Sequence, residues 1–334
     1  MTKINKIIFW ISYTIFVLFV FVIVDVFVLK GIFKIGNQRL SNNLQAVQCK
    51  VEYPYAGFIS RSIAETEPFS IYYTGEEIYK DTENKIKIAF FGGSTAAFND
   101  NQVPDSKTIP QYLESILKNK LKKDVVVINY ACGGAHHRQH LHMLLEFLPK
   151  FKPDIVIYYG GNNETIQAMT DDPRFSYPFN YYYKAEMPIW IKMIAEYSAI
   201  GGVLYDKIDK YFLEKVRKRI RSGTPKYYKA MEDNYIETIK LSKNVTNTFK
   251  SKIFGNAVFV SIFQPLNIIP AKVVDETRRK LKSLDYAYDF YNKYDKFSKD
   301  IYYDYCHVKD EANQYMAGEI ADLLINKYLK KYKK

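Results

Sequence analysis

The sequence predicts an α/β fold of three layers, in which helices cover both faces of a central parallel sheet. Four short apolar runs indicate buried strands, at residues 86–91, 125–129, 154–159 and 257–263. Helical periodicity follows the first two runs, at residues 109–122 and 139–150, and a long C-terminal helix is expected from about Asp310. Because strands that alternate with helices are joined by right-handed crossovers, we expect the sheet to be parallel.

A long apolar segment precedes this domain. Residues 7–28 are interrupted only by Ser12, Tyr13, Thr14 and Asp25. At about 1.5 Å per residue the segment reaches roughly 33 Å, which is enough to cross the core of a bilayer. It is longer than the apolar core of a signal peptide, and no small-residue cleavage motif follows it. We therefore predict an uncleaved transmembrane signal anchor over residues 1–31, in preference to a cleaved signal or a buried helix.

The charges that flank the anchor do not decide its orientation. Lys3 and Lys6 precede the apolar segment, whereas Lys30, Lys34 and Arg39 follow it. A single N-terminal anchor ahead of a large folded domain usually leaves that domain outside the cytoplasm. We expect an extracytoplasmic domain, either periplasmic or on the cell surface.

The rest of the chain divides into a linker and a main domain. We expect residues 32–84 to form a linker that becomes a cover, and residues 85–334 to form the α/β domain. A helical insertion at residues 165–252 separates the third and fourth strands; it opens with a polar and aromatic loop that includes Tyr177. Helices are expected within it around residues 188–221 and 226–250. An insertion that starts at the carboxyl end of a strand would lie over a site at that edge.

Composition excludes two classes of protein. Lys and Arg number 48 against 36 Asp and Glu, a formal net charge of +12, but no nucleic-acid-binding module accompanies the excess. The basic residues concentrate at 215–221 and 327–334, as solvated helix ends or as a surface that faces anionic lipid. The three cysteines, Cys49, Cys132 and Cys306, cannot all pair, so the chain is not a disulfide scaffold. Packing is the expected role of Cys132 and Cys306, and a bridge between them is the alternative.

A serine, a histidine and a carboxylate stand in two short segments far apart in the chain. Gly92-Gly93-Ser94-Thr95 follows the first predicted strand, and Asp304-Tyr305-Cys306-His307 lies near the C-terminus. The two glycines allow a tight turn that would present Ser94 at the carboxyl edge of the sheet, where open α/β sheets hold their sites. These are the three groups that an acyl-transferring serine needs.

Two further glycine turns complete the predicted site. The strand at residues 125–129 leads through Asn129 to Gly134, and the strand at 154–159 leads to Gly161-x-Asn163-Glu164. A tetrahedral intermediate needs hydrogen-bond donors where its negative charge develops. The backbone N–H groups of Ser94 and Gly134, with the side-chain amide of Asn163, are the donors that we predict for this oxyanion hole.

In these residues the sequence resembles the SGNH hydrolase superfamily, also called GDSL-type esterases and lipases. Ser94, Gly134, Asn163 and His307 match its four blocks in order, and the resemblance extends over residues 85–321. The resemblance is to membrane-attached members whose first block is Gly-Gly-Ser-Thr. The Gln-Pro pair at residues 264–265 looks like the end of the fourth strand in these members. The resemblance implies a flavodoxin-like three-layer fold. The chain departs from the usual family pattern at two places: Gly-Gly-Ser-Thr stands for Gly-Asp-Ser-Leu, and Glu164 stands for the commoner aspartate. Neither departure removes a catalytic atom.

The expected reaction is acyl transfer through a covalent intermediate on Ser94. His307 would take the serine proton, and Asp304 would fix the tautomer of the imidazole. The resemblance implies a serine esterase or O-acyltransferase acting on small acyl esters, such as acetyl groups on cell-envelope carbohydrates, with no cofactor. A lipid or thioester hydrolase and a catalytically silent envelope scaffold are the alternatives. A membrane protein that donates acyl groups is a possible partner.

Four of the five histidines follow Gly134 within a few residues, namely His136, His137, His140 and His142. His136 and His140 would share a helix face, as metal ligands do, but no Glu or cysteine pair completes a metal motif. We predict no metal. Substrate contacts are assigned to His136, His137 and Tyr177, with plain surface or interface positions as the alternative for the histidines and packing for the tyrosine.

Overall fold

The computed structural model describes residues 3–32, 50–53, 57–60, 82–98, 105–169, 194, 197–220, 224–265, 271–304 and 306–332. The chain divides into two compact units. The first consists of Met1–Gln48 and Asn180–Arg219, and the second of Cys49–Phe179 and Ile220–Lys334.

The first unit contains the N-terminal helix and most of one helix of the insertion. Helix α1 (Lys3–Ile23) continues as a π-helix, η1 (Val24–Ile32), and α10 spans Ala199–Ile220. Among the described residues one helix, Lys3–Gly31, is long and apolar enough to cross a membrane. A signal sequence would pass the same test, so the finding supports either an anchor or a signal.

The second unit is built on a five-stranded sheet in which every pairing is parallel. Its strand order is β4-β3-β5-β8-β9. The strands are β3 (Ile86–Gly92), β4 (Val125–Asn129), β5 (Ile155–Gly160), β8 (Val258–Phe263) and β9 (Ala287–Asp289). The four predicted strands are confirmed within one residue, and β9 is an additional short strand at the edge.

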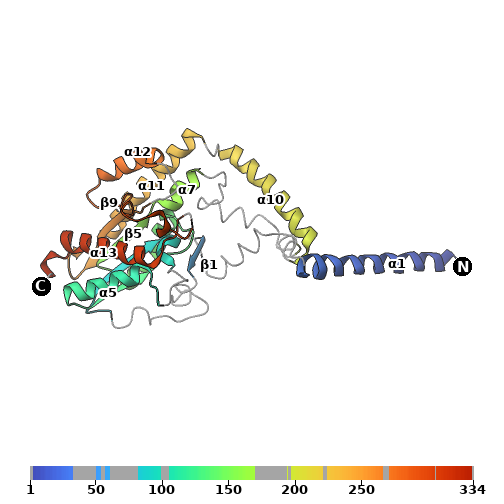
Figure 1. The fold of residues 1–334 in the computed structure, drawn as a ribbon, viewed down its shortest axis with the longest axis horizontal. Coiled ribbons are helices and arrows are strands. Elements are labelled where there is room, and N and C mark those ends of the chain that lie inside the picture. The colour runs from blue at the N-terminus through green and yellow to red at the C-terminus, as the bar shows by residue number, and fades with distance from the viewer. Residues whose placement is uncertain are drawn as a thin grey trace. The chain divides into compact units, whose positions relative to one another are not determined.

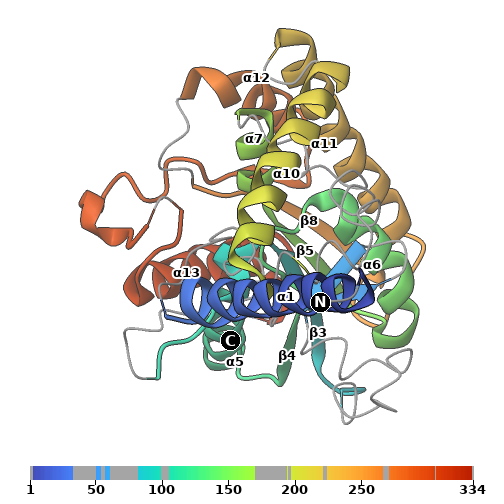
Figure 2. The ribbon, with the colours of Figure 1, turned by 90° about the vertical axis from the view of Figure 1, so that its right-hand side faces the viewer.

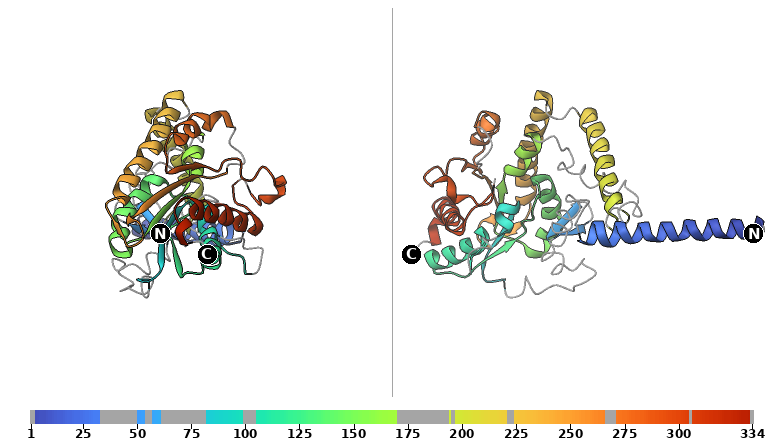
Figure 3. Two further views of the ribbon diagram at one scale, coloured as in Figure 1. Left: turned by 90° about the vertical axis from the view of Figure 1, so that its left-hand side faces the viewer. Right: turned by 45° about the vertical axis from the view of Figure 1, so that its right-hand side comes forward.

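Helices cover both faces of the sheet, which confirms the three-layer α/β/α fold. One face carries α5 (Ile109–Leu121) and α13 (Asp310–Lys327), which lie side by side (Figure 1). The other carries α6 (His137–Phe151), α11 (Pro225–Thr246) and α12 (Ala271–Lys282). Figure 2 shows the sheet between α13 and α6, and Figure 3 shows α11 and α12 apart from α5 and α13.

Alternation along the strands explains these two cores. In β3, Ile88 and Phe90 pack toward α5 and α13, whereas Ala89 and Phe91 pack toward α6 and α11. All four side chains are fully buried. Because successive side chains of a strand point to opposite faces, a continuous apolar run is what a strand covered on both sides requires.

The remaining elements are short connections or pairs. They are β1 (Lys50–Tyr53) with β2 (Gly57–Ser60), α4 (Ser94–Ala97), α7 (Asn162–Met169), β6 (Lys250–Ser251) with β7 (Gly255–Asn256), η4 (Lys299–Ile301) and η5 (Lys330–Tyr332). Strands β1 and β2 form an antiparallel pair within the predicted linker.

Parallel strands bring their carboxyl ends to one edge. Gly92 at the end of β3 pairs with Tyr159 of β5, and Phe90 pairs with Asn129 at the end of β4. The three glycine turns that the sequence singled out therefore leave the sheet at the same edge.

Candidate active site

Ser94 lies at the turn between strand β3 and the short helix α4. The preceding residue, Gly93, has an extended backbone (φ −85°, ψ −161°). A Cβ on Gly92 would lie 2.8 Å from the Cβ of Ala96 and 3.0 Å from the carbonyl oxygen of Tyr159. Because real side chains do not tolerate such contacts, glycine is needed for α4 to pack this closely on the sheet. The turn leaves Ser94 only half-buried at the carboxyl edge.

The second glycine turn lies beside the serine. The backbone N–H of Cys132 donates to the carbonyl oxygen of Gly92 at 3.0 Å. A Cβ on Gly133 would lie 3.8 Å from the Cβ of Ser94. Gly134 has a φ of +76°, in the left-handed region that favours glycine. The backbone after β4 is thus held close to the point where an oxyanion would form on an acyl group at Ser94.

The amide of Asn163 contacts both of these turns. Its Nδ2 donates to the carbonyl oxygen of Ala135 at 2.7 Å, and a Cβ on Gly93 would lie only 2.5 Å from the same nitrogen. An amide nitrogen carries two hydrogens, so this bond leaves a second one for another acceptor. Asn163 therefore lies next to the serine turn, and its role as an oxyanion donor stays a prediction.

Asp304 and His307 form a hydrogen-bonded pair within one turn of the chain. Oδ2 of Asp304 lies 2.6 Å from Nδ1 of His307, and Oδ1 accepts from the backbone N–H groups of Cys306 at 2.8 Å and His307 at 2.7 Å. Partial burial alone would raise the pKa of Asp304, but these backbone bonds and the His307 ring lower it below its usual range. An ionised carboxylate only accepts, so Nδ1 carries the hydrogen and Nε2 is the ring nitrogen that can take a proton.

Phe98 connects the histidine to the serine helix. The N–H of Phe98 donates to the carbonyl oxygen of Ser94 at 3.0 Å. Its ring centroid lies 6.3 Å from that of His307, and a Cβ on Gly133 would meet its ring at 3.1 Å. The segments that carry Ser94 and His307 thus meet around one aromatic ring. A direct approach of about 3 Å between the Ser94 hydroxyl and the imidazole stays a prediction.

Three of the four clustered histidines are buried, and the fourth, His142, is half-buried. His136, His137 and His140 expose 5%, 1% and 0% of their surface. Burial, with the neighbouring His137, lowers the pKa of His140 to about 3, so its ring is neutral at physiological pH. Nε2 of His140 lies 3.1 Å from the carbonyl oxygen of Gly92. Because a carbonyl only accepts, the ring donates and holds the end of β3 just before Ser94.

Glu164 ties the first residue of α6 to the third glycine turn. Its Oε1 accepts from the backbone N–H of His137 at 2.7 Å and from Nδ1 of the same ring at 3.1 Å, and its Oε2 accepts from the N–H of Gly161 at 3.1 Å. Burial alone would raise the pKa of Glu164, but the His137 charge and hydrogen bonds, with His136, lower it overall. A Cβ on Gly160 would lie 2.2 Å from Cε1 of His137. The imidazole therefore fits only because residue 160 is glycine.

The structure leaves some predicted roles as predictions. Tyr177 and the aromatic loop around it lie outside the described residues. His136 and His137 were assigned to substrate contact, and the structure places both in the interior, His137 against Glu164. Cys132 and Cys306 are buried, and neither forms a disulfide.

The sequence did not predict the bonds of His140 and Glu164. The signal available was a glutamate directly after Asn163 and a glycine at the end of β5. Glu164 and its partner in α6, His137, are 27 residues apart in the chain. Their hydrogen bond therefore depends on how α6 packs on the sheet.

Within the described part of the chain, one group of side chains combines three metal-donor types at close range. It is Asp304, Cys306 and His307, whose donor atoms lie within 4.8 Å of one another. The short bond between Oδ2 of Asp304 and Nδ1 of His307 already accounts for two of these groups as a hydrogen-bonded pair. The proposed reaction needs no metal at this place.

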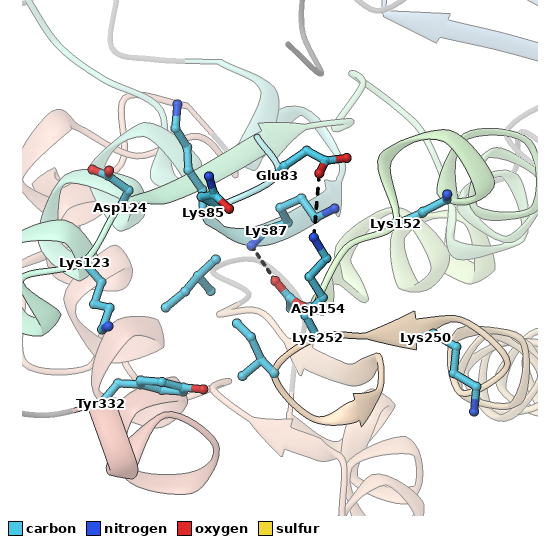
Figure 4. Close-up of a pocket in the computed structure, with 13 residues that line it drawn as sticks. Glu83, Lys85, Lys87, Lys123, Asp124, Lys152, Asp154, Lys250, Lys252 and Tyr332 are labelled. Atoms are coloured by element: carbon cyan, nitrogen blue, oxygen red, sulfur yellow. Dashed lines mark hydrogen bonds and ion pairs between the residues drawn. The ribbon is translucent and has the colours of Figure 1, made fainter. Parts of the chain in front are cut away.

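A pocket of about 390 Å³ lies at the opposite edge of the sheet (Figure 4). Its lining comes from the start of β3, the residues just before β3, β4 and β5, strand β6 with the turn after it, and Tyr332; it includes Lys87, Asp124 and Asp154. Asp154 is buried and accepts from the N–H of Lys87 at 2.9 Å and from the hydroxyl of Ser251 at 2.6 Å. Because the pocket is at the amino ends of the strands, it is separate from the serine turn.

Comparison with known proteins identifies a family profile and several solved structures. A profile of the family described as GDSL-like Lipase/Acylhydrolase matches residues 88–320. Comparison with curated protein sequences finds no match. Solved structures with similar folds include the lipase Lip_vut3 from a goat rumen metagenome, at 15% identity and a TM-score of 0.44, covering 71% of this chain and 97% of that one.

Two further solved structures are similar in the same way. A lipase/acylhydrolase from Enterococcus faecalis has 14% identity and a TM-score of 0.44, with 72% of this chain and 96% of that one covered. An acetyl xylan esterase, Axe2, from Geobacillus stearothermophilus has 10% identity and a TM-score of 0.39, with 70% and 92% covered.

The family profile extends over most of the chain, from β3 through the Asp304 and His307 turn into α13. It includes all three glycine turns around Ser94. This chain therefore belongs to the GDSL-like lipase/acylhydrolase family and is a serine ester hydrolase.

Proposed function

We propose that Ser94 is the nucleophile, His307 the general base and Asp304 the carboxylate that orients the base. The backbone N–H groups of Ser94 and Gly134, with the amide of Asn163, are the proposed oxyanion donors. The observation that carries this proposal is the 2.6 Å bond between Asp304 and Nδ1 of His307. It leaves Nε2 as the proton acceptor, on a turn that adjoins the Ser94 helix through Phe98.

The reaction then follows the chemistry of an acyl-enzyme. The Ser94 oxygen forms a bond to the ester carbonyl carbon while its proton passes to Nε2 of His307. The carbonyl π electrons move to the oxygen, where the three donors stabilise the negative charge. Collapse expels the alcohol, which takes the proton from His307. Water or a sugar hydroxyl then attacks the acyl-enzyme by the same steps in reverse.

The proposed substrates are small acyl esters, such as O-acetyl groups, on carbohydrates of the cell envelope. Two half-exposed aromatic rings beside the base support a sugar ligand. Tyr303 stacks on His307 with ring centroids 5.8 Å apart and an angle of 12° between the planes, and the ring of Phe98 is tilted by 55° to the same imidazole at 6.3 Å. Aromatic faces of this kind pack well against sugar rings. A membrane protein that supplies acyl groups would be the partner if the enzyme is a transferase.

The proposed location is a bilayer entered by residues 7–28, with the catalytic unit outside the cytoplasm. The contact between Asp25 and Ile200 supports a retained anchor, because a cleaved signal would not be part of the folded protein. Oδ1 of Asp25 accepts from the N–H of Ile200 at 2.9 Å, and Asp25 is buried. Protease digestion of cells with the outer envelope removed and the cytoplasmic membrane intact tests the side: degradation of the catalytic unit only after the cytoplasmic membrane is opened would contradict an extracytoplasmic position.

A fluorophosphonate probe tests the nucleophile. The wild-type protein should be labelled, and Ser94→Ala should not. Ser115→Ala is the matched control, since Ser115 is half-exposed on α5, away from the serine turn, and its hydroxyl donates to the carbonyl oxygen of Gln111 in the same helix; it should label like wild type. Equal labelling of Ser94→Ala and wild type, with both proteins folded by circular dichroism, would remove Ser94 from the mechanism.

An acyl-length and acceptor series tests the substrate. Para-nitrophenyl acetate should be turned over faster than the butyrate, octanoate and palmitate esters, and acetylated glycans should release acetate. Faster turnover of the long chains would favour the lipid hydrolase instead. Transfer of labelled acetyl to an added glycan distinguishes transferase from hydrolase; if water is the only acceptor, the transferase branch fails.

A further inference from the structure

The N-terminal helix contains one acidic residue, and the structure shows what holds it. Helix α1 is exposed along its length, but Asp25, in the first turn of η1, is only 5% exposed. An ionised carboxylate inside a membrane-spanning segment is costly, so it needs a partner at its own depth. Oδ1 of Asp25 accepts from the backbone N–H of Ile200 at 2.9 Å. Both residues belong to the same compact unit.

The partner is the amino end of helix α10. The first N–H groups of a helix have no acceptor within the helix and carry partial positive charge. In α10 the N–H of Gly201 donates to the hydroxyl of Ser198 at 2.7 Å, and that of Ile200 donates to Asp25. Asp25 therefore completes the cap of α10. Because Asp25 lies near the C-terminal end of the candidate membrane span, the start of α10 must lie at the same depth as Asp25.

The first three turns of α10 expose an apolar face. Ile200, Val203, Leu204, Ile208 and Tyr211 are 40%, 41%, 53%, 42% and 64% exposed. Their spacing of three and four residues places them on one side of the helix. A contiguous apolar stripe of this kind is unfavourable in water and needs a nonpolar environment.

Basic residues share this face. Lys207 lies between the apolar side chains, and Lys215 and Lys218 continue the stripe toward the end of the helix; all three are exposed. Lysines near an apolar stripe can extend their ammonium groups to lipid phosphates while their stems stay among the acyl chains. Glu214 is also exposed on this side of the helix, and the three lysines leave the stripe with a net positive charge that matches an anionic headgroup layer.

We propose that α10 is an interfacial membrane helix, whose first three turns lie in the headgroup and acyl boundary of the bilayer that the N-terminal helix crosses. Asp25 fixes the depth at which it starts. The apolar stripe faces acyl chains, and Lys207, Lys215 and Lys218 face phosphates. The inference rests on the proposed anchor, but it is independent of the proposed esterase chemistry.

Site-directed spin labels on the full chain in liposomes of phosphatidylcholine and phosphatidylglycerol test this placement. Single cysteines for the label replace Leu204 on the stripe, Lys218 near the end of α10 and Phe16 in the middle of α1. Cys49→Ser is the background, since Cys132 and Cys306 are buried. The background without an added cysteine controls for labelling of those two.

Oxygen concentrates in lipid and a nickel chelate in water, so their collision rates report depth. The label at 204 should collide more with oxygen, as at 16, and the label at 218 more with nickel. A nickel-accessible label at 204 would place the stripe in water, and a label shielded from both reagents would place it under protein; either result overturns the proposal. A water-exposed label at 16 would refute the anchor itself.

Variants of Asp25 test the fixed depth. Asp25→Asn keeps the acceptor oxygen and should leave the label at 204 unchanged. Asp25→Leu removes the acceptor and should lower the oxygen-to-nickel ratio at 204 several-fold, with the label at 16 unaffected. No change at 204 in Asp25→Leu would show that this bond does not set the depth of α10. Fluorophosphonate labelling of Ser94 in the same samples reports the enzymatic proposal separately.

Discussion

The two oxygens of the Asp304 carboxylate make different hydrogen bonds. Oδ1 holds the backbone N–H groups of Cys306 and His307, whereas Oδ2 holds Nδ1 of the ring. Asparagine can keep the bonds from the backbone, because its oxygen also accepts hydrogen bonds. It cannot keep the bond from Nδ1, since its NH2 donates and would favour the tautomer in which Nε2 carries the hydrogen.

Asp304→Asn should therefore lower kcat by about 10³- to 10⁴-fold with a small change in KM, because the imidazole can no longer accept the serine proton. Steady-state kinetics on para-nitrophenyl acetate measure this. Asp300→Asn is the matched control on the neighbouring turn, where the exposed carboxylate accepts from the Ser298 hydroxyl. Equal kcat values for the two variants would argue against Asp304 as the orienting group.

Glu164 is expected to act as a positioning residue for the oxyanion donors. It holds both His137, three residues after Gly134, and Gly161, two residues before Asn163. Glu164→Gln would turn an NH2 donor toward one of these N–H groups, and kcat should fall about 10- to 100-fold with little change in KM.

Asp154→Asn separates this role from a general loss of stability. Asp154 is an equally buried carboxylate that holds a backbone N–H, but at the opposite edge of the sheet. Both variants should lower Tm, and only Glu164→Gln should lower kcat per active site, counted by fluorophosphonate titration. If both lower kcat alike, the effect of Glu164 is structural only. If Ser94 is unlabelled in wild type, the enzymatic proposal fails first.

Helix α6 links the glycine turns. It begins just after Gly134, and it bonds the end of β3 through His140 and the turn after β5 through His137 and Glu164. Its close approach to β5 depends on the missing side chain at Gly160. The arrangement of the donors is thus a property of how one helix packs on two strands.

A pair of glycine substitutions tests this packing. Gly160→Ala places a Cβ 2.2 Å from the buried ring of His137 and should destabilise the protein by about 1–3 kcal/mol, with reduced kcat. Gly318→Ala, in the middle of α13 with open space around it, should stabilise by up to about 1 kcal/mol. Urea unfolding measures both. An unchanged free energy of unfolding in Gly160→Ala would mean that α6 can shift to accommodate the added methyl group.

The elements that sequence could predict are those with strong patterns. Residues 125–129 are confirmed as β4 because an uninterrupted β-branched run ends in a turn. Strand β9 has three half-buried residues and no alternation to detect. Helix α6 begins two residues earlier than the predicted 139, since buried His137 looks polar in the sequence.

The candidate site shows the same division. Ser94, Gly134, Asn163, Asp304 and His307 follow from short motifs, because each is fixed by its own turn. The pairing of Glu164 with His137 and of His140 with Gly92 could not be predicted, because each joins segments from different strands. Such contacts depend on the register of α6 against the sheet, which local sequence does not specify.

At the scale of the whole molecule, buried His140 makes stability depend on pH. Its pKa falls from 6.5 to about 3 on folding, first because of burial and then because of His137 and His136, with Glu164 opposing. The unfolded chain therefore binds a proton between these values that the folded chain does not. Stability is full above about pH 6.5 and is lost as the pH falls, by up to about 1.4 kcal/mol per pH unit.

His140→Gln should weaken this dependence, since an amide donates to Gly92 without titrating. Urea unfolding at pH 5, 6, 7 and 8 measures the slopes. Asp304 and Glu164, whose pKa values are lowered, contribute only further into acid. A variant slope equal to that of wild type between pH 5 and 6.5 would show that His140 is not the group responsible.

The chain passes between its two units after Gln48, after Phe179 and after Arg219. With residues 7–28 as the proposed retained anchor, release of the catalytic unit by proteolysis therefore takes more than one cut. A cut just beyond the anchor would leave the catalytic unit covalently joined to α10, which is capped by Asp25 of the anchor and proposed to lie in the bilayer. Release would require the insertion to be severed as well, so a nicked enzyme should remain in the membrane fraction.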